Sequence, residues 1–170
     1  MEPLNFEDLS TEQLRILRVS DHPEILRECL RLLPCEEDRE ELTAASGAWF
    51  LALYRSIGTE NAHCCIYRGK VRALFGFNPN ELPNALVPWL ITDGVLRREL
   101  PVSFHRQCRR VLARARSVGK VLVNWAMEDC LRYDWLEYLG FRIGPTRTWL
   151  RGKPFRRFLW RPEKEKKKHV

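Results

Sequence analysis

The sequence predicts an α/β domain with a mixed central sheet. Three observations support this prediction. Residues 62–68 and 71–77 alternate between apolar and polar around the turn Arg68-Gly69, which is typical of an antiparallel hairpin. An amphipathic helix, residues 103–118, lies between two apolar strands, as in a parallel strand-helix-strand crossover. A second hairpin turn, Arg151-Gly152, joins two further strands near the C-terminal end.

Composition predicts one domain and one basic tail. A chain of 170 residues with 45% hydrophobic residues is long enough to bury one core, and we place that domain at residues 1–162. Residues 163–170 are rich in lysine, and we expect them to be disordered. No apolar run reaches the roughly 20 residues that cross a bilayer, and the first residues do not resemble a secretory signal. We therefore expect a cytoplasmic protein without a membrane-spanning segment.

The cysteines predict neither a metal site nor a disulfide framework. The six cysteines lack the paired C-x-x-C spacing of a zinc site, and Cys64 and Cys65 are adjacent. We interpret them as free thiols that pack as small hydrophobic side chains in a reducing compartment.

The N-terminal half begins with a strand and two helices. Residues 14–19 form the strand, and Ser20 or Asp21 caps a helix that starts near Pro23. The acidic run at residues 36–38 suits the start of a second helix, because negative charge is favourable there. Its apolar face continues to Gly58. The antiparallel hairpin follows.

The C-terminal half carries the crossover and a last hairpin. Residues 85–92 are apolar on both faces, and Pro88 predicts a bulge because proline cannot donate to a ladder. A loop, residues 93–102, leads to the helix, which Ser103 caps and Gly119 ends. The strand 120–127, a short helix ending at Gly140, and strands 141–150 and 155–161 complete the order.

This order of elements resembles that of the GNAT acetyltransferases. The stretch 128–141 is similar to the family's helix that ends in a Gly-Phe pair, here Gly140-Phe141. Pro88 stands where GNAT proteins have the bulge that separates two parallel strands and opens a slot for acetyl-CoA. The resemblance spans residues 12–160 and implies a GNAT-like mixed sheet.

Several short segments resemble a narrower group, the small GNAT-like proteins of short-tailed bacteriophages, some of which are internal virion proteins. They are Asp21 with the helix after it, residues 69–77, 88–90, 123–125 and 135–141. This resemblance implies synthesis in a host cytoplasm, a place in the virion, and other phage or virion proteins as partners.

The acetyl-CoA loop of the GNAT enzymes is missing. The family binds the pyrophosphate on a turn of the form [Q/R]-x-x-G-x-[G/A], where backbone N–H groups meet phosphate. The corresponding loop, residues 93–102, has one glycine and one proline. If acetyl-CoA binds, Arg97, Arg98 and Ser103 are the candidate cofactor-binding residues, because the arginines could hold phosphates by charge. Otherwise these residues form a solvated basic loop and the protein uses no cofactor.

No residue can be assigned as catalytic. Leu136 occupies the place of the family's general-acid tyrosine, and Asp129 replaces a common asparagine. Tyr133 and Tyr138 are nearby, but each step along a helix rotates the side chain by about 100°. Neither tyrosine is therefore in register with the position of the family's tyrosine. Glu99 is an unsupported candidate base, and we interpret His63 as a residue of the sheet.

Positive charge gathers in two parts of the chain. The net charge is +7. Arg106, Arg109 and Arg110 lie off the apolar stripe of the helix at 103–118, and Arg156 and Arg157 lie in the last strand. These five residues are candidates for contact with DNA or another anionic partner, which would be independent of sequence and sensitive to salt. The alternative is a solvated surface.

Three functions follow as hypotheses. The first is a non-catalytic phage protein of the virion or an accessory component, acting through protein contacts with DNA nearby. The second is an acyl-CoA-dependent N-acetyltransferase with an atypical loop. The third is a nonspecific nucleic-acid-binding protein.

Overall fold

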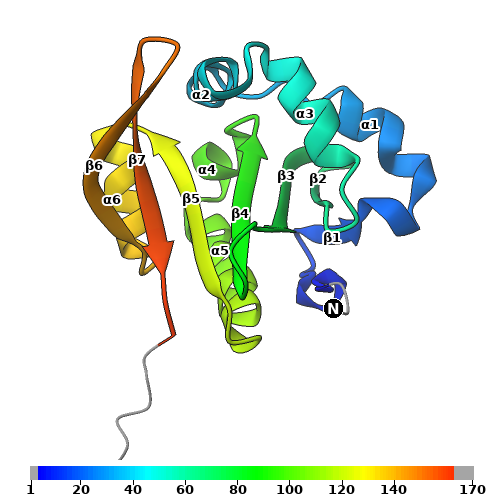
Figure 1. Cartoon of the computed structure of the whole chain (residues 1–170). Helices are drawn as coiled ribbons and strands as arrows, with labels where there is room; N and C mark the ends of the chain where they lie inside the picture. The colour runs from blue at the N-terminus through cyan, green and yellow to red at the C-terminus, as the bar shows by residue number, and fades with distance from the viewer. Residues whose placement is uncertain (1–3, 163–170) are drawn as a thin grey trace, which may run out of the picture.

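The computed structural model describes residues 4–162 and has a seven-stranded sheet in the order β1-β2-β3-β4-β5-β7-β6 (Figure 1). All neighbouring strands are antiparallel except β4 and β5, which confirms the predicted mixed sheet. The predicted tail lies outside the described residues. The strands are β1 (Arg15–Arg18), β2 (His63–Tyr67), β3 (Lys70–Pro79), β4 (Ala85–Thr92), β5 (Val121–Met127), β6 (Arg142–Leu150) and β7 (Lys153–Trp160).

The helices depart from the predicted ones in two places. The region 36–58 is not one helix, because Gly47 adopts a left-handed conformation with φ +88° and ends the first helix. The predicted loop 93–102 contains a short helix, and the next helix begins at Pro101 rather than after a Ser103 cap. The α-helices are α1 (Leu26–Leu30), α2 (Glu36–Ser46), α3 (Trp49–Ile57), α4 (Val95–Glu99), α5 (Pro101–Ser117) and α6 (Cys130–Tyr138).

Helices cover both faces of the sheet. On one face, Leu53 and Ile57 of α3 and Cys29 of α1 pack against strand residues such as Leu74 and Ile91. On the other face, α5 and α6 pack against β3, β4, β5 and β7. The two layers bury strand residues on both sides, as expected for an α/β sheet. Within residues 4–162, no helix is both long and apolar enough to cross a membrane.

An N-terminal segment extends the core in a way that the sequence did not indicate. Phe6 is completely buried and contacts the rings of His63 and Phe75. It precedes a short 3₁₀ turn, Glu7–Leu9, whose Leu9 carbonyl accepts a hydrogen bond from Gln107 of α5. The segment is therefore part of the folded domain.

Strands β4 and β5 separate after two paired positions. The parallel register joins Ala85 to Val121 and Leu86 to Leu122, and no further pair follows along either strand. In Figure 1, β5 curves away from β4, and α2 lies above the widening gap. The separation begins next to Pro88, which still pairs with Phe77 of β3. The candidate site is built around this gap.

Candidate functional site between strands β4 and β5

The narrow end of the gap is bridged by one side chain of β5. Asn124 Nδ2 donates a hydrogen bond to the carbonyl of Pro88, at 2.8 Å. The same amide accepts from the N–H of Trp125 through its oxygen, at 2.8 Å. The side chain therefore takes the place of the missing backbone ladder between the two strands. The register of β3 with β4 runs past Pro88 without a shift, so the predicted bulge is absent there, and the Pro88 carbonyl has its partner on β5.

The wide end of β4 is occupied by residues at the start of α2. Asp38 Oδ2 accepts from the backbone N–H of Thr92 at 2.8 Å, and the N–H of Cys35 donates to the Thr92 carbonyl at 2.8 Å. Both backbone groups of the last β4 residue are thus used. The sequence indicated the acidic run only as a helix start, because nothing local pairs Asp38 with a residue 54 positions away.

The end of β5 is occupied in the same way. Glu41, one turn after Asp38 on α2, accepts from the N–H of Met127 at 3.4 Å. Arg132 of α6 binds both carboxylates: it pairs with Asp38 at 3.4 Å and with Glu41 through a very short contact. All three side chains are at most 19% exposed. Since α2 and α6 belong to opposite helical layers, this ion-pair cluster crosses the gap.

Burial dominates the titration of this cluster. It raises the pKa of Glu41 to about 7, and the Arg132 guanidinium opposes that rise. It raises the pKa of Asp38 as well, against the hydrogen bond from Thr92. Asp38, Glu41 and Arg132 therefore pair with one another inside the protein, and the backbone donates further hydrogen bonds to the two carboxylates.

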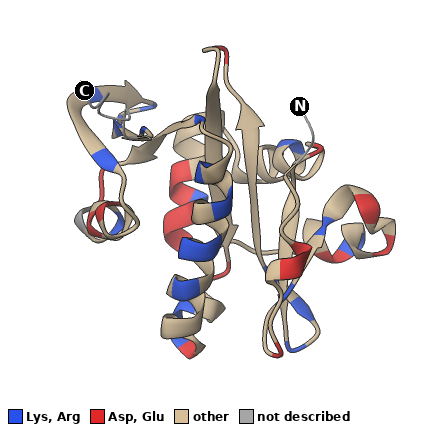
Figure 2. Cartoon of the chain, turned by 90° about the horizontal axis from the view of Figure 1, so that it is seen from below, with Lys and Arg blue, Asp and Glu red and all other residues tan. Residues whose placement is uncertain are grey.

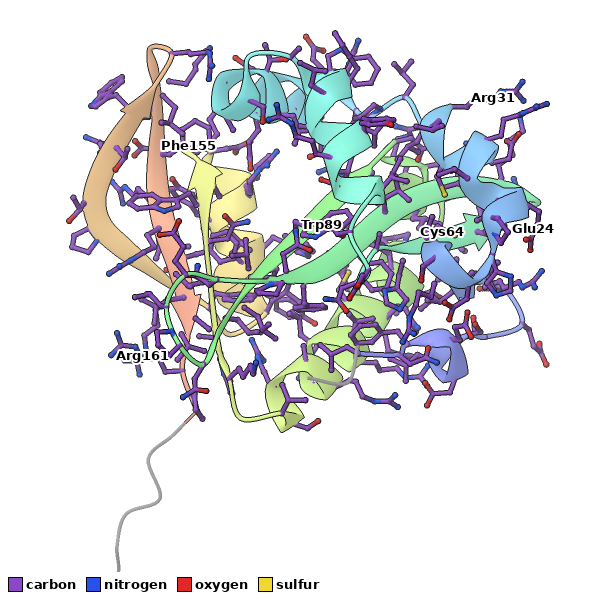
Figure 3. The ribbon with its side chains drawn as sticks, turned by 45° about the vertical axis from the view of Figure 1, so that its right-hand side comes forward. Glu24, Arg31, Cys64, Trp89, Phe155 and Arg161 are labelled. Atoms are coloured by element: carbon purple, nitrogen blue, oxygen red, sulfur yellow. The ribbon has the colours of Figure 1, made fainter. Side chains whose placement is uncertain are left out.

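Trp89 of β4 packs over the neighbouring strand β3, on the face of the sheet that α1 and α3 cover. Figure 3 shows Trp89 in the middle of the molecule, on β4. Its ring lies so close to Gly76 of β3 that a Cβ on Gly76 would come within 2.7 Å of it. Gly76 is therefore required for the indole to lie across the sheet.

The loop after β4 does not offer a phosphate cradle. The N–H of Gly94 donates to Thr92 Oγ1, and that of Val95 donates to Asp93 Oδ1. The Asp93 carboxylate pairs with Arg72 at 2.9 Å. At the start of α5, Pro101 has no N–H. The N–H groups of Gly94 and Val95 are therefore engaged within the protein rather than free to bind a pyrophosphate.

The three candidate cofactor residues lie in two different helices. Arg97 and Arg98 are in α4, and Arg97 pairs with Glu37 at 3.6 Å. Ser103 is the third residue of α5, preceded by Pro101 and Val102. Because Arg97 and Arg98 lie in α4, the prediction that residues 93–102 form a loop without a helix is wrong.

The residues considered for acid-base roles have other partners. Leu136 is buried in the core, and the Tyr133 hydroxyl donates to the Ala126 carbonyl of β5 at 3.2 Å. Glu99 pairs with Arg68 at 3.0 Å. His63 is fully buried and stacks on Phe75, and burial lowers its pKa to about 4. It is a neutral core residue.

A hairpin covers the outer side of α2. The β6–β7 turn carries Arg151, which donates to the carbonyls of Ala44 and Ala45 near the end of α2, at 3.0 and 3.2 Å. Lys153 pairs with Glu40 at 2.5 Å. The hairpin thereby holds α2 in place over the gap.

The five predicted anion-binding arginines are divided between two places. Arg106, Arg109 and Arg110 are exposed on α5. Arg156 pairs with Glu128 at 3.1 Å, and Arg157 lies next to it on β7. In Figure 2, where Lys and Arg are blue and Asp and Glu are red, both colours appear in the middle of the view, but α5 itself contains no Asp or Glu.

Cysteine chemistry contributes nothing further to the site. Burial raises the pKa of Cys65 and of Cys108 to about 12 and that of Cys35 to about 11, so these thiols stay protonated at neutral pH. In the part of the chain that the structure describes, no three His, Cys, Asp or Glu residues gather as metal ligands.

Comparison with solved structures defines the class of fold. A protein from Bordetella pertussis assigned to the GNAT-family acetyltransferases is 16% identical, with a TM-score of 0.62 over 90% of this chain and 98% of that one. A protein from Salmonella typhimurium assigned as an acetyltransferase, solved with its cofactor acetyl-CoA, gives 0.53 at 15% identity, over 91% and 96%. The ribosomal-protein-S18-alanine N-acetyltransferase from Escherichia coli gives 0.55 at 11%, over 90% and 96%.

This chain therefore has the fold of the GNAT acetyltransferases, as the sequence resemblance implied. At these identities the likeness extends to the fold and no further. Neither a family model nor a curated protein sequence matches the chain.

Proposed function

We propose that this chain is a GNAT-fold protein without acyltransferase activity, which works through protein contacts as a component of a tailed-phage particle or as an accessory phage protein. One observation supports the absence of acyltransferase activity, and the phage role rests on the sequence resemblance. Arg132 crosses the gap between β4 and β5 and binds Asp38 and Glu41, which also hold the Thr92 and Met127 amides. In a GNAT enzyme, the acyl-CoA slot is at this position.

The energetics favour a closed gap. Opening it would separate a guanidinium from two buried carboxylates, and removing one partner of such a buried pair costs about 3–5 kcal/mol. An acyl donor would have to supply that free energy without a glycine-rich turn for its pyrophosphate.

A second candidate, an acyl-CoA-dependent N-acetyltransferase, has its own support. The fold is shared with acetyltransferases, one of them solved with acetyl-CoA. The raised pKa of Glu41, about 7, would suit a general base at neutral pH. This candidate requires Arg132 to leave Glu41 when the donor binds.

Calorimetric titration with acetyl-CoA separates the two candidates. We expect no heat of binding from the wild-type protein at micromolar to millimolar acetyl-CoA. Micromolar binding that weakens in the Arg97→Ala/Arg98→Ala variant would favour the enzyme instead. Arg27→Ala/Arg55→Ala is the matched control, because both arginines are exposed on helices of the opposite layer.

The phage role is tested separately. Mass spectrometry of purified particles from the phage that encodes this chain should detect the protein in fixed copy number. Its absence from complete particles would leave only the accessory role, and a coding neighbourhood without capsid and tail genes would contradict both.

A further inference from the structure

An open groove of about 580 Å³ lies along the outer side of α5, away from the closed gap. It is lined by Val102, His105, Arg106, Arg109, Arg110, Ala113 and Tyr138. At a rise of 1.5 Å per residue, the α5 side of the groove from residue 102 to 113 is about 16 Å long. No carboxylate belongs to this lining.

None of the three arginines of the groove has an acidic partner. Arg106, Arg109 and Arg110 are exposed, and none of them forms an ion pair with a carboxylate of residues 4–162. Of the other two arginines of α5, Arg114 pairs with Asp8 and Arg116 donates to the Leu139 carbonyl. Most of the uncompensated charge of this helix therefore lies in the groove.

An aromatic platform stands beside these charges. Tyr138 at the end of α6 is 60% exposed, which is unusual for an aromatic ring with several fixed neighbours. The Arg109 guanidinium lies 5.7 Å from its ring centre, and the His105 ring meets it edge-on at 6.0 Å. His105 in turn accepts a hydrogen bond from Trp135 Nε1 at 3.0 Å, which fixes its orientation. The Tyr138 ring is thus held in place while most of it faces solvent.

We propose that this groove binds a single strand of nucleic acid, with phosphates on Arg106 and Arg109 and a base stacked on Tyr138. Cations combined with an exposed aromatic ring are the recurring features of single-strand sites, because every base has a face that can stack. An acidic peptide would use the charges and leave the ring without a role. A duplex keeps its bases stacked inside, so it too would leave the ring unused.

The length of the groove favours a strand over a free nucleotide. A groove about 16 Å long can hold more than one phosphate of an extended strand, whereas a free nucleotide would fill only part of it. The site is independent of the closed gap, so its failure and the failure of the proposed function would be distinguishable.

Fluorescence anisotropy with a labelled single-stranded 20-mer of mixed sequence tests the proposal. We expect Tyr138→Ala to weaken binding about tenfold, as base-aromatic stacking predicts, and Tyr138→Phe to retain it. Tyr54→Ala is the matched control, because Tyr54 is an equally exposed helical tyrosine, 68% accessible, on the opposite layer. Circular dichroism confirms that each variant is folded.

Salt dependence tests the two arginines. Arg106→Ala/Arg109→Ala should reduce the slope of log K against log salt by about 1.4, since each phosphate contact on a single strand contributes about 0.7. Arg27→Ala/Arg55→Ala should leave the slope unchanged.

Three outcomes would overturn the proposal. Equal affinities of Tyr138→Ala and Tyr54→Ala would exclude the stacking platform. Equal displacement of the strand by polyglutamate and by oligo-dT would identify a site for polyanions in general. Full displacement by micromolar adenosine diphosphate would identify a free nucleotide as the ligand.

Discussion

At the scale of single residues, polar side chains replace a missing part of the β-ladder. Asn124, Asp38 and Glu41 each bond a backbone group of β4 or β5 that a neighbouring strand would satisfy in a continuous sheet. Buried backbone groups need such partners, because an unpaired one costs about 1–3 kcal/mol. The separated strands are therefore satisfied within the protein itself.

The titration of Glu41 gives the first prediction. Its pKa in the folded protein, about 7, exceeds the ordinary value of 4.5. The folded state therefore binds the additional proton between these values. The resulting stabilisation is complete below pH 4.5 and is lost as the pH rises through 7. Glu41→Gln lacks this dependence. The free energy of unfolding of the wild type minus that of the variant should therefore be about 1–3 kcal/mol larger at pH 5 than at pH 8.

Urea unfolding, followed by tryptophan fluorescence at pH 5 and at pH 8, measures the free energy of unfolding of the wild type and of Glu41→Gln. His63, whose folded pKa is about 4, changes stability in the opposite direction between pH 4 and 6.5. It is present in both proteins, so its effect cancels in the difference. Asp38 and Arg132 face Glu41, and the Asp38 charge contributes to the raised pKa of Glu41, so the difference reports Glu41 together with its coupling to Asp38. A difference that grows toward pH 8 would show that the Arg132 charge, rather than burial, governs Glu41.

The contact between Gly76 and Trp89 gives a second prediction. Gly76→Ala places a Cβ within 2.7 Å of the indole and of the Asn61 carbonyl, so it should lower the free energy of unfolding by about 1–3 kcal/mol. Gly58→Ala is the control: its φ is −73° and its added Cβ would have only ordinary contacts, at 3.6 Å or more. Equal stability of the two variants would contradict the described position of Trp89.

At the scale of elements, α2 acts as a cover for the gap. Its inner side contacts the ends of β4 and β5, and its last turn is held by Arg151 of the β6–β7 hairpin. The helix can stay in this position because Gly47 ends it and allows α3 to turn back over the sheet. A continuous helix from residue 36 to residue 58, as the sequence pattern predicts, could not both lie over the gap and turn back over the sheet.

The ion-pair cluster gives a third prediction, on how α2 and α6 are joined. Arg132→Met leaves two buried carboxylates without their cation and should cost about 3–5 kcal/mol of stability. The triple variant Asp38→Asn/Glu41→Gln/Arg132→Met should recover most of that loss, since it removes the charges together. Chemical denaturation of both variants at pH 8 provides the measurement. A single variant as stable as wild type would mean that the cluster is solvated and does not close the gap.

At the scale of the whole molecule, the elements were predictable and their long-range contacts were not. Alternation and the turns at Gly69 and Gly152 indicated the hairpins, and the apolar period indicated α5. The five-residue α4 is too short to show a period. Arg132 and Asp38 are 94 positions apart, so no local pattern joins them. The N-terminal turn was missed because Phe6 and Leu9 form no repeat of their own.

The same limit applies to function. The missing glycine-rich turn was visible in the sequence, because a phosphate cradle depends on local backbone. The means by which the gap is closed depends on side chains from α2, β5 and α6 that meet only in the folded protein. The exposed position of Tyr138 beside Arg109 likewise depends on how α6 and α5 pack together.

Hydrogen exchange at the Thr92 and Met127 amides, measured by NMR with and without acetyl-CoA, tests the central claim most directly. If Asp38 and Glu41 close the gap, both amides exchange slowly in the free protein, and one millimolar acetyl-CoA leaves their rates unchanged. Fast exchange in the free protein that slows when acetyl-CoA is added would show an open slot that accepts the acyl donor, and would contradict the account.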